Sequence, residues 1–165
     1  MTHTAYNSTL KPGIPLKRSW LESKPRKKRK PKRVSKKKQY DKVLMPLWRK
    51  LVKENAGYKC EKCGREDRKL DSHHLWRKDI IALRWNPENG ACLCSIPCHI
   101  WGKPDNPAAH DDVEGMRQLI KQKRGQAWYD RMHIQSLIKK GIAKVDVVME
   151  KLWLEQELQR LKEEI

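Results

Sequence analysis

Two pairs of closely spaced cysteines constrain this chain more than any other feature of its sequence. Cys60 and Cys63 are separated by two residues, and about thirty residues later Cys94 and Cys98 are separated by three. A tetrahedral structural zinc site is built from two such pairs, because each pair closes a tight loop around the ion. Cys92 is a competing ligand, since two residues before Cys94 in an extended segment it would face the same side. We predict that Cys60, Cys63, Cys94 and Cys98 bind zinc; the alternative is five cysteines without a ligand role.

Positive charge is concentrated at the N-terminus. The chain has 165 residues and a net charge of +18. Residues 1–38 contain fourteen Lys or Arg and one acidic residue, whereas residues 39–165 contain twenty-four basic and nineteen acidic residues. We predict a disordered basic arm over residues 1–38 that binds a polyanion by releasing its counterions, and nucleic acid is the expected partner. Within this arm the predicted nucleic-acid contacts are Lys27, Lys28, Arg29 and Lys30.

The apolar residues are too dispersed for a membrane protein. No stretch approaches the roughly 18 apolar residues of a transmembrane helix, and the N-terminus lacks the apolar region of a signal peptide. We therefore expect no membrane partner and a cytoplasmic location, where thiols stay reduced and clustered cysteines bind metal. In a eukaryotic protein the basic run would also be typical of a nuclear-localisation signal.

Hydrophobic spacing predicts an α+β fold. Apolar residues at helical spacing between Tyr40 and Val52 predict a helix that Pro46 kinks or interrupts. Three extended segments are predicted next, over 70–76, 80–85 and 91–94, with a turn at 86–90. Pro97 favours the start of a short or broken helix. The remaining predicted helices cover 106–124, 128–140 and 146–165, and the last carries a leucine stripe that indicates intramolecular packing.

A histidine pair at the end of the first predicted strand is the second constraint. His73 and His74 are adjacent, so on a strand they project in different directions, and one can bind a metal while the other faces water. Asn89 follows fifteen residues after His74, and His99 directly follows Cys98. This arrangement ties a rigid zinc unit to a second metal position.

These residues resemble a known family, the HNH endonucleases, in the subgroup with two cysteine pairs at a zinc site. The resemblance rests on CEKCG, DSHHLWRK and RWNPENGACLCSIPCHIWG, and covers about residues 57–110. The chain is most similar to small phage and prophage HNH proteins with a basic arm, and more loosely to the phage recombination proteins related to NinG. The resemblance implies a ββα-metal core with a preceding helix, cleavage of DNA, and a bacterial host cytoplasm. It also implies partners among phage replication, recombination or packaging proteins.

The resemblance implies a role for each motif residue. His73 falls on the first metal ligand, His74 on the general base, and His99 on the final metal ligand. Asn89 falls on the residue that holds the motif loop and orients the base. The implied catalytic ion is Mg²⁺ or another divalent cation. Some relatives carry a further histidine four residues after the last one, where this chain has Lys103. We therefore expect two histidine ligands, which His110 would join only if the Gly102–Pro107 loop folds back.

The residues that flank the motif suggest a nucleic-acid channel. Arg77, Lys78 and Arg84 are predicted to contact phosphates, and Trp76 to stack on a base. A solvated basic loop is the alternative. The domains expected are the arm at 1–38, a nuclease domain at 39–110 and a helical extension at 111–165.

Two other functions remain open. One is a zinc-binding nucleic-acid module without catalysis, and the other is a basic architectural or ribosome-associated protein. An enzyme needs a second metal position between His73 and His99, with His74 free of structural hydrogen bonds, whereas a binding module needs only the zinc.

Overall fold

A small antiparallel sheet lies at the centre of the part of the chain that the structure describes, residues 34–139 and 141–163. In this computed structural model, strand β1 is Leu70–His74 and strand β2 is Gly90–Cys94. Leu70 pairs with Cys94, and His74 pairs with Gly90. Strand β1 therefore lies within the predicted segment 70–76, and β2 begins one residue before the predicted segment 91–94. Their pairing places the end of β1, which carries the histidine pair, beside the start of β2.

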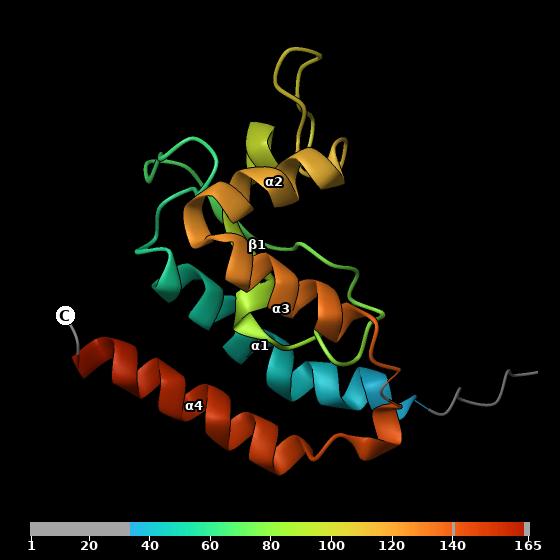
Figure 1. Ribbon diagram of the computed structural model, residues 1–165. Helices are drawn as coiled ribbons and strands as arrows, with labels where there is room; N and C mark the ends of the chain where they lie inside the picture. The colour runs from blue at the N-terminus through green and yellow to red at the C-terminus, as the bar shows by residue number, and fades with distance from the viewer. Residues whose placement is uncertain (1–33, 140, 164–165) are drawn as a thin grey trace, which may run out of the picture. The chain divides into compact units, whose positions relative to one another are not determined.

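The sheet separates two hydrophobic clusters because its side chains alternate between its faces. Ala91 and Leu93 belong to a cluster with helix α2 (Val113–Arg124) and helix α3 (Gln126–Ser136). Cys92 points the other way, into a cluster with helix α1 (Lys36–Asn55) and helix α4 (Val147–Glu163). Figure 1 shows α2 and α3 in front of β1, with α1 and α4 below them. The fold is therefore mixed α and β, as predicted.

Helix α1 runs through Pro46 without interruption. Proline removes the donor that would bind the carbonyl of Lys42 four residues earlier. Pro46 and Lys42 both line an open cleft, so that carbonyl can be solvated rather than buried. The Ser35 hydroxyl accepts a hydrogen bond from the backbone N–H of Lys38 and caps the start of the helix.

Two predicted elements are wrong. Residues 80–85 form hydrogen-bonded turns, in which the N–H of Leu83 donates to the carbonyl of Ile80, so their backbone does not pair as a strand. No helix begins at Asn106, because Asn106 pairs with Lys103 across the loop. Helix α2 begins at Val113, where the Asp112 carboxylate accepts from the N–H of Gly115. The apolar residues of both segments are explained by packing into the clusters rather than by a regular element.

The segment around Pro97 forms a single five-residue π-helical turn, η3 (Ser95–His99). Two short 3₁₀ turns complete the elements, η2 (Pro87–Asn89) and η4 (Ile142–Lys144). Gly125 separates α2 from α3 at φ 88°, a backbone conformation that glycine adopts without strain.

The last helix is confirmed where it was predicted. Asp146 accepts from the N–H groups of Val148 and Met149 and so caps α4. Leu154 and Leu158 are buried in the cluster with α1, which confirms intramolecular packing of the stripe. Between residues 34 and 163, apart from 140, no helix is long and apolar enough to cross a membrane.

Candidate metal centres and cleft

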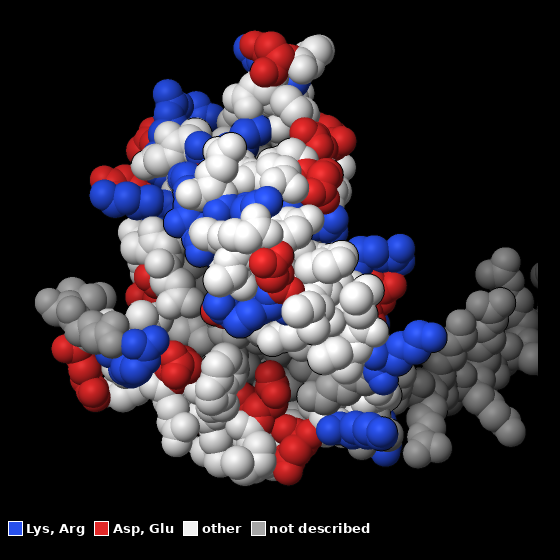
Figure 2. Space-filling model, viewed as in Figure 1, with Lys and Arg blue, Asp and Glu red and all other residues white. Residues whose placement is uncertain are grey.

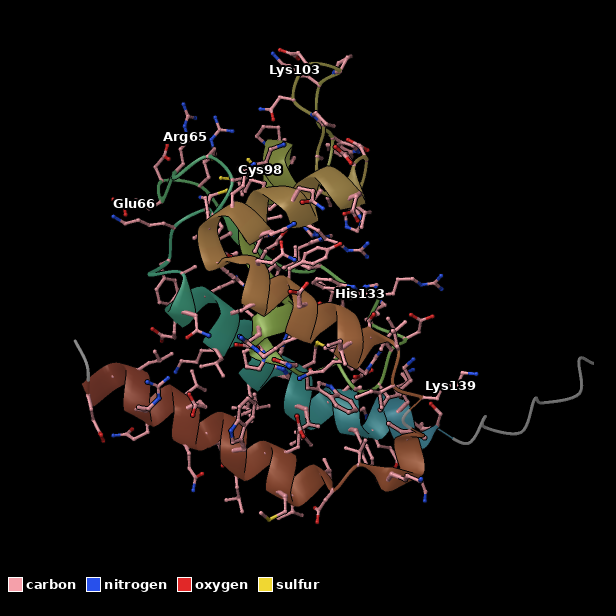
Figure 3. All side chains as sticks on the ribbon, viewed as in Figure 1. Arg65, Glu66, Cys98, Lys103, His133 and Lys139 are labelled. Atoms are coloured by element: carbon pink, nitrogen blue, oxygen red, sulfur yellow. The ribbon has the colours of Figure 1, made fainter. Side chains whose placement is uncertain are left out.

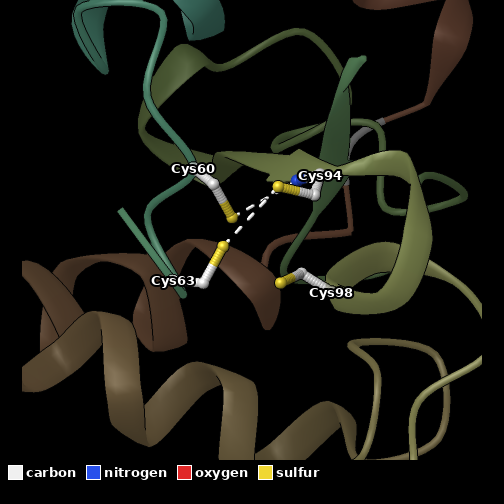
Figure 4. Close-up of side chains that lie close together, drawn as sticks. All are labelled: Cys60, Cys63, Cys94 and Cys98. Carbon is white, nitrogen blue, oxygen red and sulfur yellow. Dashed lines mark hydrogen bonds between the residues drawn. The ribbon is translucent and has the colours of Figure 1, made fainter. Parts of the chain in front are cut away.

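The four predicted cysteines converge. Cys60, Cys63, Cys94 and Cys98 each offer a sulfur atom, and these atoms all lie within 4.8 Å of one another. Cys63 Sγ lies 3.6 Å from Cys94 Sγ, and the N–H of Cys94 donates to Cys60 Sγ over 3.3 Å (Figure 4). Four sulfur donors at this separation could hold a metal ion such as zinc. Cys92 lies outside the group, which decides the choice that the sequence left open.

Local geometry explains why the first pair forms a knuckle. The N–H of Gly64 donates to the carbonyl of Cys60 over 2.8 Å, and Gly64 has φ 75°. A side chain at that φ would be strained, so the glycine directly after Cys63 lets the loop close.

The pKa values of the clustered cysteines are those expected of a site that binds a cation. Burial and the neighbouring thiols raise the pKa of Cys94 to about 12, and they raise that of Cys98 further. Burial also acts on Cys63, but hydrogen bonds from the Arg65 backbone and the other thiols lower its pKa to about 7. Four packed thiols therefore cannot all ionise by themselves. A divalent cation would hold them as thiolates, with release of protons.

A second cluster contains three histidines. His73 in β1, His99 at the end of η3, and His110 each offer a ring nitrogen, and these atoms lie within 4.8 Å of one another. Two histidine ligands were expected, with His110 as a third only if its loop folded back, and that condition is met. His110 joins because the loop that follows His99 folds back, so that the N–H of Ala109 donates to the carbonyl of Cys98 over 2.9 Å.

The loop from Cys60 to Cys63 also holds this returning loop in place. The Lys62 ammonium, between Cys60 and Cys63, donates to the carbonyl of Pro107. The two clusters are therefore linked through the backbone of the three residues that precede His110. Figure 3 shows Lys103 at the outer end of the loop that rises beyond Cys98.

Asp71 sets the orientation of His99. Nδ1 of His99 lies 3.3 Å from the Asp71 carboxylate, so it donates its proton there and Nε2 keeps a lone pair. That Nε2 lies 3.1 Å from Nε2 of His110. Two nitrogens 3.1 Å apart, each about 2.1 Å from one ion, subtend roughly 95° at that ion. Three imidazoles with a carboxylate behind one of them fit a divalent transition ion, and they suit Mg²⁺ less well.

His73 is the buried member of the histidine cluster. It is 6% exposed, and burial together with the neighbouring His99 and His110 lowers its pKa to about 3. The ring is therefore neutral at physiological pH, which is the form that binds metal.

His74 projects to the opposite face of β1 from His73, as expected for neighbours on a strand. Its ring stacks on Trp48 of α1 with ring centroids 3.9 Å apart, and its Nε2 lies 2.9 Å from the carbonyl of Arg84. A carbonyl can only accept, so Nε2 donates and Nδ1 keeps the lone pair. The condition that His74 be free of structural hydrogen bonds is therefore not met. The one bond that it makes leaves a basic nitrogen, and burial lowers the pKa of the ring to about 4.

Asn89 is buried and clamps the loop between the strands. Its Oδ1 accepts from the N–H of Trp76 over 2.7 Å. Its Nδ2 donates to the carbonyls of Trp76 and Leu83 over 3.1 and 3.0 Å. With an exposed fraction of 0%, Asn89 cannot touch a substrate. It is a positioning residue that holds the loop whose end supplies the Arg84 carbonyl to His74.

A cleft of about 830 Å³ joins these features. Its lining includes all three histidines of the cluster and His74. The basic side chains that line it are Lys38, Lys42, Arg49, Arg77, Lys78, Arg84 and Arg117, against two acidic ones, Asp41 and Asp79. On the face shown in Figure 2, over α2, α3 and α4, basic and acidic groups are intermixed. The cleft is thus much more strongly cationic than that face.

The predicted nucleic-acid contacts differ in their accessibility. Arg77 and Lys78 are exposed at the cleft, and Arg77 pairs with Asp79. Arg84 is only 5% exposed and its guanidinium donates to both oxygens of Asp41, so it stabilises the fold. Trp76 is buried under Arg117 and cannot stack on a base. Lys27, Lys28, Arg29 and Lys30 lie outside the described residues.

Five contributors to the site were missed at the sequence level, and His110 was expected only if its loop folded back. Lys38, Lys42 and Arg49 are spaced by four and seven residues, which places them on one face of α1, and that periodicity is visible in the sequence. Asp71 is two residues before His73, so the alternation of a strand could have placed it on the same face. The positions of Arg117 and His110 at the site depend on how the chain after His99 folds back, and no local sequence pattern indicates them.

Comparisons with family models, curated proteins and solved structures find no match to this chain.

Proposed function

We propose that this chain is a metal-dependent endonuclease of the HNH type that hydrolyses phosphodiester bonds in DNA. The observation that carries the proposal is the convergence of three histidine nitrogens within 4.8 Å on the wall of a cationic cleft, with His74 beside them. A phosphodiester is an anion, so both its binding and the negative charge that develops during hydrolysis favour such a cleft.

His74 is the proposed general base. The hydrogen bond from its Nε2 to the Arg84 carbonyl fixes the tautomer, so Nδ1 takes a proton from water. The resulting hydroxide attacks phosphorus and the bond to the 3′ oxygen breaks. That oxygen gains a proton from solvent, and the products are a 5′-phosphate and a 3′-hydroxyl. A base of this kind contributes about 10²–10⁴-fold to the rate.

His73, His99 and His110 would hold the catalytic ion, and the four cysteines a structural zinc. A divalent cation bound to the histidines supplies charge neutralisation at the scissile phosphate and at the leaving oxygen. Because the donors are imidazoles, we propose a transition ion in place of the Mg²⁺ named by family resemblance. Zn²⁺, Co²⁺ or Ni²⁺ should then support cleavage at concentrations far below those required of Mg²⁺.

The helix α1 is the proposed track for the DNA backbone. Lys38, Lys42, Arg49 and Lys78 line the cleft, and none of them forms an ion pair with the residues described here. Each phosphate contact contributes about 0.9 to the slope of log K against log salt. Replacement of Lys42 by Ala should lower that slope by about one, whereas Lys139→Ala, at an exposed site outside the cleft lining, should not change it.

The deciding experiment is cleavage of supercoiled plasmid by wild type and His74→Ala over a panel of divalent ions. His133→Ala is the matched control, because His133 is exposed on α3 and lies outside the cleft lining. We expect His74→Ala to lose at least 10²-fold in rate while it binds DNA and retains zinc. Wild-type cleavage at the same rate as His74→Ala would refute the assignment of the base.

A binding module without catalysis is the second candidate. It is favoured by the stacking of His74 on Trp48 and by its bond to Arg84, since both also stabilise the fold. In that case the wild type would bind DNA with a steep salt dependence and would cleave it with none of the ions.

A further inference from the structure

Trp101 is a tryptophan that does not belong to either hydrophobic cluster. Its side chain is 74% exposed, the highest value among the large apolar residues exposed in the described chain. Its backbone has φ 59°, a left-handed conformation that is a clear outlier for a bulky residue. Trp101 therefore combines backbone strain with almost no burial, whereas a core residue would recover such a cost by packing.

The backbone around Trp101 is held firmly. The N–H of Gly102 and that of Ala108 both donate to one oxygen of the Asp111 carboxylate, over 3.3 and 3.1 Å. A Cβ at position 102 would lie 2.0 Å from the backbone nitrogen of Ala108, so the two arms of the loop touch at that point. Trp101 is thus presented from a closed loop base rather than from a loose tip.

This loop base adjoins the histidine cluster. The chain leaves the cluster at His99, two residues before Trp101, and returns to it at His110, one residue before Asp111. Two residues of chain span at most about 7 Å. The backbone of Trp101 therefore lies within about 7 Å of that of His99, so the exposed ring can reach a nucleotide that adjoins a phosphate bound at the histidine cluster.

The surroundings favour a nucleic-acid base over a protein partner. The loop beyond Trp101 is polar and reads Gly-Lys-Pro-Asp-Asn, so exposed apolar neighbours, Ile96 and Ile100, precede Trp101 in the chain but do not follow it. An exposed aromatic ring two residues from a histidine that lines a cationic cleft is an arrangement suited to stacking on single-stranded bases. In an intact duplex, the bases are already stacked on each other and their faces are closed to a side chain.

We propose that Trp101 stacks on an unpaired base next to the scissile phosphate, so that the preferred substrate is DNA with unpaired nucleotides at the cut, such as a gap or a flap. This inference rests on the proposed function. In the proposal Trp101 determines specificity, while proton transfer stays with His74.

The test compares three DNAs of one sequence: an intact duplex, a duplex with a one-nucleotide gap, and a single strand. Cleavage is measured with wild type, Trp101→Ala, Trp101→Phe and Trp153→Ala. Trp153 is the matched control, because it is a second exposed tryptophan, 44% exposed on α4, a helix that supplies no residue to the cleft lining or to the histidine cluster. Zinc content and circular dichroism show that each variant is folded.

Wild type should cleave the gapped DNA faster than the duplex, and Trp101→Ala should reduce that preference by about 5- to 100-fold, the range expected for one stacked base. Trp101→Phe should keep most of the preference, and Trp153→Ala all of it. An unchanged preference in Trp101→Ala would overturn the inference, as would an equal loss of rate on all three DNAs.

Failure of the proposed function is distinguishable from failure of this inference. If the wild type cleaves none of the DNAs with any ion, the nuclease proposal fails. Dissociation constants for the gapped and intact duplexes, measured with Ca²⁺, then test Trp101 directly. A 5-fold or greater loss of gap preference on Trp101→Ala supports stacking, and a smaller change overturns it.

Discussion

Replacement of Asn89 by alanine should destabilise the protein by about 3–5 kcal/mol. The side chain makes three hydrogen bonds to backbone groups, and both the side chain and the Trp76 partner are buried. A typical hydrogen bond contributes about 1 kcal/mol net, and each buried backbone group left without a partner costs about 1–3 kcal/mol. Three bonds therefore set the lower bound of about 3 kcal/mol, and about 5 kcal/mol is the usual upper limit for one substitution.

The assay is equilibrium unfolding in urea at a fixed zinc concentration, since bound metal contributes to stability. Asn89→Asp is nearly isosteric, but it removes the donor to the carbonyls of Trp76 and Leu83, so it should be at least as destabilising as alanine. Asn86→Ala is the control, because Asn86 only caps η2 and bonds Gln135, and it should cost about 1 kcal/mol. A loss below about 1 kcal/mol for Asn89→Ala would refute the clamp.

Three further predictions concern the metal, the pH dependence and the strained loop. Cys63→Ala should lose the tightly held zinc, while Cys92→Ala should keep it and lose only packing, as metal analysis after dialysis against a chelator would show. Burial raises the pKa of Asp41, but the bonds and charge of Arg84 outweigh it and lower that pKa below its usual value, so the pair stabilises the fold above about pH 4. That contribution should vanish as the pH falls through the lowered pKa, and Asp41→Asn should flatten the acid limb of the stability curve. Trp101→Gly should raise the free energy of unfolding by about 1 kcal/mol, because glycine adopts φ 59° without strain; a decrease would mean that the side chain supports the fold.

Part of the site could be read from local sequence because its geometry is local. A knuckle of Cys60, Cys63 and Gly64 needs only a few residues, and its spacing indicates sulfur ligands directly. The opposite directions of His73 and His74 follow from the alternation of a strand, which requires no knowledge of the fold. The capping of α4 by Asp146 is equally local.

Other parts depended on contacts between distant segments. Arg84 has the side chain of a phosphate ligand, but Asp41, forty-three residues away, accepts from its Nε and Nη2, and the Lys78 carbonyl accepts from its Nη1. Trp76 was predicted to face solvent, yet α2 and α3 cover it with Arg117 and Trp128. Both side chains are buried by contacts that local sequence does not indicate. Burial gives them a structural role in place of the predicted contact with nucleic acid.

The cysteine cluster and the histidine cluster also differ in how far the sequence alone could predict them. The sequence by itself determined which cysteines could serve as ligands, because each pair lies within five residues and chain geometry brings its sulfur atoms together. Only the tertiary structure decided between Cys92 and Cys94, since Cys92 packs into the cluster with α1 whereas Cys94 lies with Cys60 and Cys98. It alone brought His110 to His73 and His99, because that position depends on a loop closed by backbone bonds to Cys98 and Asp111. Ligands that lie within one turn can therefore be predicted from their spacing in the sequence. A ligand such as His110, which a long loop separates from the others, can be identified only from the packing that folds the loop back.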